Sequence, residues 1–431
     1  MTTLFWHRRD LRIEDNAGLY KALKTQNEVQ PIFIFDANIL SKLPANDQRV
    51  LFIHQEITRL SKEYSDLGVD LKIYHGDPRI ILPKLCSELN IKSVVTNRDY
   101  EPYALNRDQF IFEKLQALNI TFTGAKDHVI FEKNEVLKND GTPYTVFTPY
   151  SRKWKEKLTD FYLSSYPIEK YYQYLKKSQT SPIPTLKDLG FESKQTTDFP
   201  AASEPLSVIS NYKETRDIPS IIGTSRLSIH LRFGTISIRK LALTALKLNE
   251  SYLNELIWRD FYQMILFHFP YSATSSFRSK YDKIEWERNE IHFNAWCEGK
   301  TGYPLVDAGM RELNATGFMH NRVRMVVASF FTKHLLLDWR LGEAYFAQKL
   351  LDFELASNVG GWQWASGSGC DAAPYFRVFN PTSQQEKFDK EFKYIKKWVP
   401  EFGTSAYPAP IIDHAFARNR AIERYKSALN V

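Results

Sequence analysis

The chain has 431 residues, 43% of them hydrophobic and 25% charged, and it carries a formal net charge of +7. This length suits two or three globular domains, and the charge suits a polyanionic partner, although many cytoplasmic proteins are as basic without binding nucleic acid. Because the sequence contains neither a run of about eighteen apolar residues nor a secretory signal, we expect a cytoplasmic monomer that does not bind a membrane.

The first 130 residues alternate β-rich runs with amphipathic helices. The expected strands are short and rich in β-branched or aromatic residues, and they cover residues 3–6, 29–35, 71–74 and 93–96. One expected helix lies between the second and third strands, at residues 48–67, and another follows the fourth strand, at residues 102–118. Strands that alternate with helices form a parallel sheet. We therefore predict an α/β domain of the Rossmann-like type over residues 1–130.

The pattern changes twice after this domain. From residue 131 to 200 it is interrupted by prolines and by a polar run, KKSQTSP, which predicts a long connecting segment. Beyond residue 200 the pattern is helical almost throughout, without strand alternation or an internal repeat. We predict a large all-α domain over residues 201–431, and the catalytic candidates lie in it.

Two common kinds of site have little support. The three cysteines are far apart and the histidines do not form HExxH, so we predict no metal. Gly367, Gly369 and Ala372 match the GxGxxA fingerprint of dinucleotide-binding folds. They follow a tryptophan-rich helical segment and not the first strand of a βαβ unit, so we interpret this match as accidental.

Residues 251–270 show the pattern of a helix with one apolar face. The opposite face combines a carboxylate, an indole, a guanidinium and a phenol, on Glu255, Trp258, Arg259 and Tyr262. Such a set can stack on a base, bind its polar edge and pair with a phosphate. A helix buried between two neighbours would show the same pattern, so both interpretations stay open.

The stretch GTSRLS, at residues 223–228, brings backbone amides, hydroxyls and Arg226 to the expected start of a helix. Helix N-termini of this kind bind phosphate. An ordinary N-cap at Thr224 or Ser225 explains the same residues.

The helix expected at residues 318–337 is apolar on nearly every side, yet its first half contains Arg322 and Arg324. A buried helix must satisfy such charges, and Asp352 or Glu354 is the expected partner. The result is either a structural ion pair or a polar wall around a cofactor. Six of the nine tryptophans also lie within one stretch of this half of the chain, residues 258–364, which together with the positive charge favours nucleic acid as a partner.

Several long segments resemble, in the same order, motifs of the cryptochrome/photolyase family. They are FWHRRDLRIEDN, GTSRLS, NELIWRDFY, GYPLVDAGMRELNATGFMHNRVRM, DWR and SNVGGWQWASGSGCDAAPYFRVFNP. The resemblance covers essentially the whole chain, which within the family is similar to class I cyclobutane pyrimidine dimer photolyases. It implies an α/β antenna domain, a helical FAD-binding domain, and repair of UV-damaged DNA by light-driven electron transfer from FADH⁻ to a flipped-out lesion.

In that family FAD binds in the helical domain. The positions here that resemble the family's FAD contacts are Tyr212, Thr224, Ser225, Arg226, Leu227, Ser228, Asn321, Arg324, Asp352, Glu354 and Asn358. The resemblance implies that Asn358 faces flavin N5 and that Arg324 pairs with Asp352 beside the isoalloxazine ring. The family often has an aspartate where this chain has Glu354, so this single contact departs from the pattern.

The resemblance also implies an electron relay and a lesion site. The relay positions, from the flavin to the surface, are Trp362, Trp339 and Trp286. The positions that match the lesion and DNA contacts are Arg216, Glu255, Trp258, Arg259, Arg322, Met325 and Trp364. The two indoles would stack on the flipped-out dimer, while Glu255 would bind it by a hydrogen bond and stabilise the added charge. The predicted catalytic residues are Glu255, Asn358 and Met325.

Single residues of this sequence bear on the substrate subtype within the family and on the antenna chromophore. Enzymes for (6-4) photoproducts carry a histidine pair, whereas Met325 stands where the second histidine is expected, which favours the cyclobutane dimer as substrate. A cryptochrome-type photoreceptor with a signalling output is the alternative. The folate-type antenna uses a glutamate where this chain has Ala104, so a second chromophore, if present, is of unknown identity.

Overall fold

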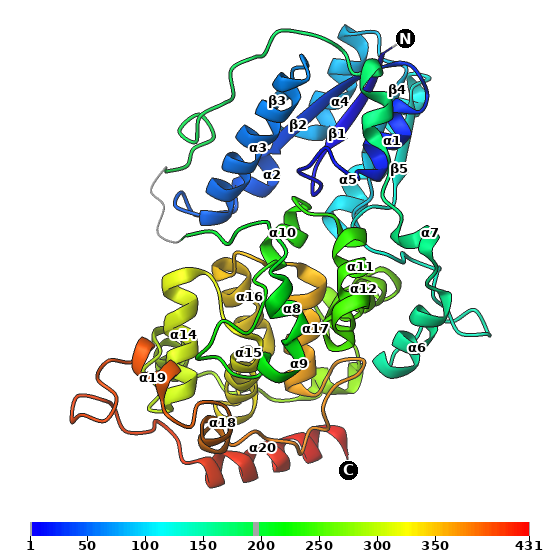
Figure 1. Cartoon of the computed structure of the whole chain (residues 1–431). Helices are drawn as coiled ribbons and strands as arrows, with labels where there is room; N and C mark the ends of the chain where they lie inside the picture. Colours follow the sequence, from blue (N-terminus) through cyan, green and yellow to red (C-terminus); the bar gives the residue numbers. More distant parts are fainter. Residues whose placement is uncertain (1, 193–197, 431) are drawn as a thin grey trace. The chain divides into compact units, whose positions relative to one another are not determined.

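The computed structural model describes residues 2–192 and 198–430, which form two compact units (Figure 1). Neither unit is one continuous stretch of chain. Unit 1 contains Met1–Glu132, Lys157–Ser203 and Leu227–Lys247, and unit 2 contains Lys133–Glu156, Glu204–Arg226 and Leu248–Val431. The segment expected to connect two domains, residues 131–200, is therefore divided between both units. Residues 227–247, expected in the helical domain, belong to unit 1.

Unit 1 is built on a parallel sheet, as the alternating pattern predicts. Its strands are β1 (Thr2–His7), β2 (Glu28–Asp36), β3 (Lys72–Gly76), β4 (Ser93–Asn97) and β5 (Thr121–Ala125). Their order in the sheet is β3-β2-β1-β4-β5, and every neighbouring pair is parallel. The four strands expected from the sequence are confirmed within a few residues, whereas β5 was not expected. The predicted α/β fold class is correct for this unit.

Helices cover both faces of this sheet. The helices of unit 1 are α1 (Ala17–Leu23), α2 (Ala37–Leu40), α3 (Gln48–Asp66), α4 (Pro78–Glu88), α5 (Pro102–Ala117), α7 (Asp160–Leu163), α10 (Ser228–Phe233) and α11 (Ile238–Leu248), with the 3₁₀ helix η1 (Ile168–Tyr174). On one face, Leu4, Ile32 and Val94 pack with the apolar sides of α4 and α5. On the other face, His7 contacts Tyr64 of α3. The alternation of buried side chains along each strand thus fills two cores.

Two buried arginines explain why residues 227–247 join unit 1. Arg239 of α11 donates to Asp15 at 3.0 Å and to Asp127 at 2.7 Å. Arg12 donates to the same Asp127 carboxylate at 2.8 Å. A buried carboxylate is stable only when such partners surround it, so this cluster fixes the segment on the sheet domain.

Unit 2 is helical, and among its described residues there is no strand. Its α-helices are α6 (Phe147–Lys157), α8 (Leu206–Ser210), α9 (Tyr212–Thr215), α12 (Glu250–His268), α13 (Glu290–Glu298), α14 (Pro304–Thr316), α15 (Asn321–Ser329), α16 (Trp339–Lys349), α17 (Leu355–Ser366), α18 (Pro381–Phe388), α19 (Lys393–Trp398) and α20 (His414–Leu429). Short 3₁₀ turns lie at η2 (Pro270–Ala273) and η3 (Ser279–Lys283). Within the described residues, no helix combines the length and the apolar character that a bilayer crossing requires.

The helix expected at residues 318–337 is shorter than predicted and changes its geometry. It begins at Asn321, where His320 is the N-cap, and the α-helical part ends at Ser329. A π-helical turn, η4 (Phe330–His334), follows it. Such turns are rare. Residues 326–337 are all buried, so the apolar pattern is the same before, within and after the turn and does not reveal it.

Candidate active site

The site is built on α12, whose two faces behave as the sequence predicts. Asn249 begins this helix, and its side chain accepts hydrogen bonds from the backbone of Ser251 and Tyr252. The apolar face is buried in unit 2 and consists of Leu253, Leu256, Ile257 and Met264. Glu255, Trp258, Arg259 and Tyr262 on the opposite face are only partly buried. This face is therefore available to other groups.

Glu255 is held by an arginine from the chain segment before α12. Arg216, which follows α9, donates from Nη1 to the Glu255 carboxylate at 2.6 Å. Burial raises the pKa of Glu255, while the charge and the hydrogen bond of Arg216 act to lower it. The carboxyl group is thus more easily protonated than an exposed glutamate, and its charged form depends on one partner.

Trp258 has a stacking partner that the sequence analysis did not identify. The ring of Phe147, the first residue of α6, lies 3.7 Å from the indole between centroids, with 3° between the ring planes. The Phe147 backbone N–H donates to Asp371 at 3.1 Å, which ties the start of α6 to the loop after α17. One face of Trp258 is therefore covered, although more than 100 residues separate it from Phe147.

The arginines predicted to contact DNA are all in ion pairs. Besides Arg216, Arg259 lies 3.2 Å from Glu354, and Arg322 lies 2.8 Å from Asp217. The last pair joins α15 to the residue next to Arg216. Each guanidinium thus has a carboxylate that a DNA phosphate would have to displace or share.

Arg324 of α15 pairs with Asp352 at 3.0 Å and donates to the carbonyl of Met319 at 2.7 Å. Of the two carboxylates expected from the sequence, Asp352 is therefore the one that satisfies this arginine. Glu354 serves Arg259 instead. On the same helix, Asn321 is exposed and Met325 is half-buried.

The GTSRLS stretch ends at the start of a helix, as the sequence predicts, but this helix begins only at the last residue of the stretch. The helix α10 starts only at Ser228, is six residues long, and has Leu227 as an N-cap without a side-chain hydrogen bond. Ser225 instead contacts the Tyr252 hydroxyl at 2.8 Å. The N-cap interpretation of Thr224 or Ser225 is therefore wrong.

Arg226 is the residue of this stretch with an unusual backbone. Its φ of 55° lies in the left-handed region, which costs energy for a residue with a side chain. Its guanidinium lies 4.4 Å above the ring of Phe318 and has no carboxylate partner among the described residues. Tyr212, on α9 of the same unit, packs edge-on against Tyr252. Leu227 and Ser228 are grouped with unit 1.

Two observations test whether these residues suit a flat, anionic cofactor such as FAD. On α17, a Cβ built at Gly361 would meet nothing within 4 Å. Asn358 and Trp364 precede and follow Gly361 by three residues, so the three positions share one face of the helix, and this face has open space at Gly361. In addition, Nε2 of His320 is buried without a hydrogen-bond partner among the described residues, while its Nδ1 accepts from the Arg322 backbone. Space for a ring and an unused donor are both present, so the residues fit such a group.

Asn358 already has a partner within the protein. Its side-chain nitrogen donates to the Glu343 carboxylate at 2.9 Å and to the Glu343 carbonyl at 3.1 Å. Burial raises the pKa of Glu343, and the Asn358 hydrogen bond lowers it. This orients the amide of Asn358, and no sequence motif pointed to Glu343.

The three predicted relay tryptophans belong to one apolar cluster of unit 2. Trp362 and Trp339 are buried in it, and Trp286 is partly exposed at its edge. Trp362 packs closely on α16, because a Cβ at Gly342 would lie 2.1 Å from its ring. Trp296, to which the sequence analysis gave no role, lies 6.1 Å from Trp362 between ring centroids.

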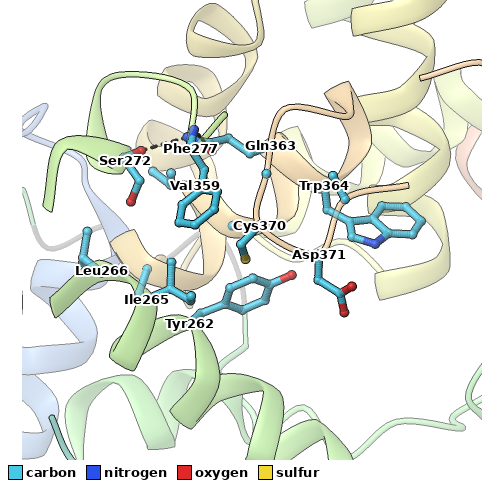
Figure 2. Close-up of a pocket in the computed structure, with 14 residues that line it drawn as sticks. Tyr262, Ile265, Leu266, Ser272, Phe277, Val359, Gln363, Trp364, Cys370 and Asp371 are labelled. Atoms are coloured by element: carbon cyan, nitrogen blue, oxygen red, sulfur yellow. Dashed lines mark hydrogen bonds between the residues drawn. The ribbon is translucent and has the colours of Figure 1, made fainter. Parts of the chain in front are cut away.

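A small cavity lies between α12 and the end of α17 (Figure 2). Figure 2 shows Tyr262 between the aliphatic residues of α12 and Cys370, with Trp364 and Asp371 on the other side. The cavity volume is about 20 Å³, which is room for about one water molecule and not for a cofactor ring. The loop that lines it contains Gly369 and Ala372 of the GxGxxA match, and Gly367 caps the C-terminus of α17, so that match is not a nucleotide-binding turn.

Comparison with known proteins agrees with this geometry over the whole chain. The sequence model of DNA photolyase matches residues 3–170, and that of the FAD binding domain of DNA photolyase matches residues 252–405. The deoxyribodipyrimidine photo-lyase of Halobacterium salinarum is 36% identical, with 99% of each chain covered. The chain belongs to the DNA photolyase family. The Synechococcus deoxyribodipyrimidine photo-lyase is 37% identical and covers 95% of this chain and 93% of its own.

Solved structures of the photolyase family have the same fold. The class III photolyase of Agrobacterium tumefaciens has a TM-score of 0.89 at 32% identity, covering 100% of this chain and 98% of its own. An archaeal photolyase from Sulfolobus tokodaii, described with two FAD molecules, has a TM-score of 0.81 at 33% identity, covering 99% and 100%. The predicted family, fold class and enzyme type are thus confirmed, and the helical unit contains the FAD-binding domain. The narrower assignment to class I stays a prediction.

Proposed function

We propose that this photolyase-family protein repairs cyclobutane pyrimidine dimers in DNA in a light-driven reaction. The observation that carries the proposal is the face of α12, where a carboxyl group with a raised pKa lies next to a partly exposed tryptophan that stacks on Phe147. A flipped-out dimer needs a flat apolar surface and a polar partner for its carbonyl edge. The name deoxyribodipyrimidine photo-lyase, borne by relatives from several organisms, supports the same substrate.

In this proposal the lesion binds between the indoles of Trp258 and Trp364, and Met325 of α15 contacts it. Glu255 donates or accepts a hydrogen bond at the carbonyl edge of the dimer. Burial raises its pKa, so the carboxyl group is more easily protonated than an exposed glutamate, and in its protonated form it donates to a carbonyl oxygen. Arg216 orients this carboxyl group and stabilises its charged form.

The residues that would hold FAD are the positions that resemble the family's FAD contacts. They are Tyr212, Thr224, Ser225, Arg226, Leu227, Ser228, Asn321, Arg324, Asp352, Glu354 and Asn358. A bound, reduced FAD would supply the light absorption and the one-electron transfer that open the dimer ring without net redox change. Asn358 is oriented by Glu343 and presents its amide to the cofactor, while Arg324 and Asp352 provide a polar wall with balanced charge.

Trp362, Trp339 and Trp286 form the proposed relay that returns oxidised cofactor to its reduced state. Indole is readily oxidised, and the three side chains lie in one cluster, with two of them buried and the last one partly exposed. This gradient of burial supports electron transfer from the surface, where an external reductant has access, to the interior.

A second, light-harvesting chromophore is part of the proposal. The archaeal photolyase with two FAD molecules, described as implying a novel light-harvesting cofactor, makes a flavin the first candidate. Purified protein is denatured and its released chromophores are separated. A second chromophore besides the FAD of unit 2 supports an antenna, and a single equivalent of FAD rejects it.

The repair assay separates an enzyme from a photoreceptor. Oligonucleotide with one thymine dimer is mixed with protein that holds reduced FAD and kept in blue light or in the dark. Loss of the dimer only in light supports repair. Light-induced changes of the FAD spectrum without loss of the dimer would favour the cryptochrome-type alternative; the similarity to a Synechocystis cryptochrome, at 24% identity, concerns the fold alone.

A further inference from the structure

A second cavity lies in unit 1, and none of the residues that line it is proposed to bind FAD or the lesion. Its volume is about 360 Å³, compared with about 20 Å³ for the cavity of Figure 2. Cavities of this size are typical of sites that bind small molecules. We call it the tyrosine cavity. Its lining includes Ala17, Tyr20 and Lys21 of α1, Lys24 directly after this helix, and Ala125 and Tyr166 from later in the chain.

The aromatic wall of the tyrosine cavity is held in place by the rest of unit 1. The rings of Tyr20 and Tyr166 lie 5.1 Å apart between centroids, with 42° between their planes. The backbone N–H of Tyr166 donates to Asp15 at 2.8 Å, and the guanidinium of Arg239 lies 4.9 Å from its ring centroid. Tyr171 packs edge-on against Tyr20 at 5.5 Å. A planar aromatic ligand can therefore pack on rings that are already positioned, which lowers the cost of binding.

Two lysines add positive charge to this cavity. Lys21 and Lys24 are exposed, and neither has a carboxylate partner among the described residues. Nζ of Lys24 lies 5.6 Å from the ring centroid of Tyr20, so positive charge lies beside the aromatic wall. A helix C-terminus favours positive side chains, so two lysines at the end of α1 do not define a site by themselves. Here they line a cavity that also has an aromatic wall, and the combination is complementary to a planar anion.

We infer that the tyrosine cavity binds a nucleoside phosphate, with the base against Tyr20 and Tyr166 and the phosphates on Lys21 and Lys24. A base supplies the planar ring that an aromatic wall accepts, and phosphate supplies the negative charge that the two lysines lack in the protein. Neither half of such a ligand alone uses both features of the cavity. The inference concerns unit 1 and does not rest on the proposed repair reaction, whose lesion-binding residues all lie in unit 2.

The test is nucleotide binding to FAD-loaded protein in the dark and without DNA. The protein is titrated with a fluorescent methylanthraniloyl derivative of ATP, mant-ATP, and ATP, adenosine and inorganic tripolyphosphate then compete with it. ATP should compete roughly tenfold better than either fragment, because only ATP contacts both the tyrosines and the lysines. An oligonucleotide with one thymine dimer should not displace mant-ATP, since the dimer is proposed to bind to unit 2.

Variants assign the bound nucleotide to the tyrosine cavity. The double variant Lys21→Gln/Lys24→Gln should weaken mant-ATP binding by roughly tenfold or more, because contacts of an ammonium group with phosphate are charge-assisted hydrogen bonds. Tyr166→Leu should weaken it by roughly fivefold through lost stacking on the base. Lys114→Gln is the matched control, because Lys114 is an exposed lysine in the last turn of α5 whose Nζ also lies 5.6 Å from an aromatic ring, that of Phe110, but outside the cavity. An unchanged circular dichroism spectrum shows that each variant is folded.

Saturable binding that the double variant loses and Lys114→Gln retains supports the nucleotide site. No saturable binding of mant-ATP, its displacement by the dimer oligonucleotide, or an equal loss with Lys114→Gln would overturn it. Tripolyphosphate that competes as well as ATP would also overturn it, because the tyrosines would then make no contribution. Failure of the proposed function looks different, since the unchanged protein would then bind mant-ATP but leave the thymine dimer intact in light.

Discussion

Glu255 is the side chain for which burial and charge act in opposite directions. Burial raises its pKa, and Arg216 counteracts this shift through its charge and its hydrogen bond. When the pKa of a carboxyl group is higher in the folded than in the unfolded protein, the group stabilises the fold fully at a pH below the unfolded-state pKa. This stabilisation is lost as the pH rises through the folded-state pKa. The protein thus maintains Glu255 at some cost in stability, as expected for a group kept for function.

Replacing Glu255 should change repair more than binding. Glu255 is proposed to interact more strongly with the dimer after electron transfer than before. Removing such an interaction lowers the rate of repair more than the affinity for the dimer. We expect Glu255→Ala to reduce repair per absorbed photon and to weaken dimer binding only modestly. Glu255→Gln should keep more activity than Ala, because its amide still donates a hydrogen bond. The measurement is repair yield with fully reduced FAD and saturating dimer.

The same measurement as a function of pH tests the role of Arg216. Arg216→Gln removes the group that lowers the pKa of Glu255, so the inflection that Glu255 produces in repair yield should move to higher pH. An inflection that persists in Glu255→Gln would belong to another group. If Glu255→Ala repairs as efficiently as the unchanged protein, the electrostatic role of Glu255 is wrong.

Between helices, the contact of α6 with α12 determines how Trp258 is presented. Phe147→Ala removes the ring stacked on the indole, and such a ring pair is worth about 0.5–1.5 kcal/mol beyond its buried area. Trp258 then loses its fixed orientation, so we expect severalfold weaker dimer binding in a titration. Phe147→Tyr should retain binding. Phe161→Ala is the control, because Phe161 is exposed on α7 of unit 1, and an equal loss there would contradict the role of Phe147.

The tryptophan cluster that joins α16 and α17 predicts a separation of two reactions. Trp286→Phe or Trp339→Phe should slow photoreduction of oxidised FAD with an external reductant, because phenylalanine is much harder to oxidise than tryptophan. Repair by protein reduced beforehand should stay largely intact, since the dimer receives its electron from FAD directly. Trp398→Phe, in α19, is the matched control within the same core. Unchanged photoreduction in both relay variants would exclude these tryptophans from the relay.

The strands and helices that the sequence predicted correctly are those with a strong pattern of apolar residues. The strands at residues 3–6 and 29–35 are runs of apolar and β-branched residues, and α12 has a clean apolar face. The strand Thr121–Ala125 was missed because TFTGA contains glycine and alanine and has little apolar signal of its own. Its position is determined by pairing with β4, which is a tertiary effect.

The partners of the site residues were largely beyond prediction from sequence. A buried charge needs a carboxylate, so the residues alone suggested Asp352 or Glu354 as the partner of Arg324, and the family resemblance implied Asp352. Arg322 and Asp217, by contrast, are 105 residues apart, and no local pattern relates them. Phe147 lies in a segment expected to be a connection, so its stacking on Trp258 had no signal. The residue types of the site could be read from the sequence, whereas their pairings needed the fold.

Across the chain, the net charge of +7 predicts how binding responds to salt. Each phosphate that an arginine neutralises releases counterions, so affinity for damaged DNA should fall steeply as salt rises. The arginines proposed to contact the backbone, Arg216, Arg259 and Arg322, are all paired with carboxylates in the protein. Each arginine therefore contributes to the free energy of DNA binding only by the amount by which its interaction with a phosphate is stronger than its interaction with the carboxylate.

Arg322 offers the sharpest test of this competition, because its partner Asp217 lies outside the helices that hold the proposed lesion site. Arg322→Ala should reduce the slope of log affinity against log salt by about one, on damaged and undamaged DNA alike. Asp217→Asn should do the reverse and raise the affinity severalfold, since Arg322 no longer gives up a charged partner when phosphate binds. Glu298→Gln changes the net charge equally, but Glu298 pairs with Lys300 at the surface, so it controls for charge alone. The double variant separates the two effects, because Asp217→Asn should gain little affinity once Arg322 is alanine. If Asp217→Asn raises the affinity for DNA no more than Glu298→Gln does, Arg322 does not contact the DNA backbone.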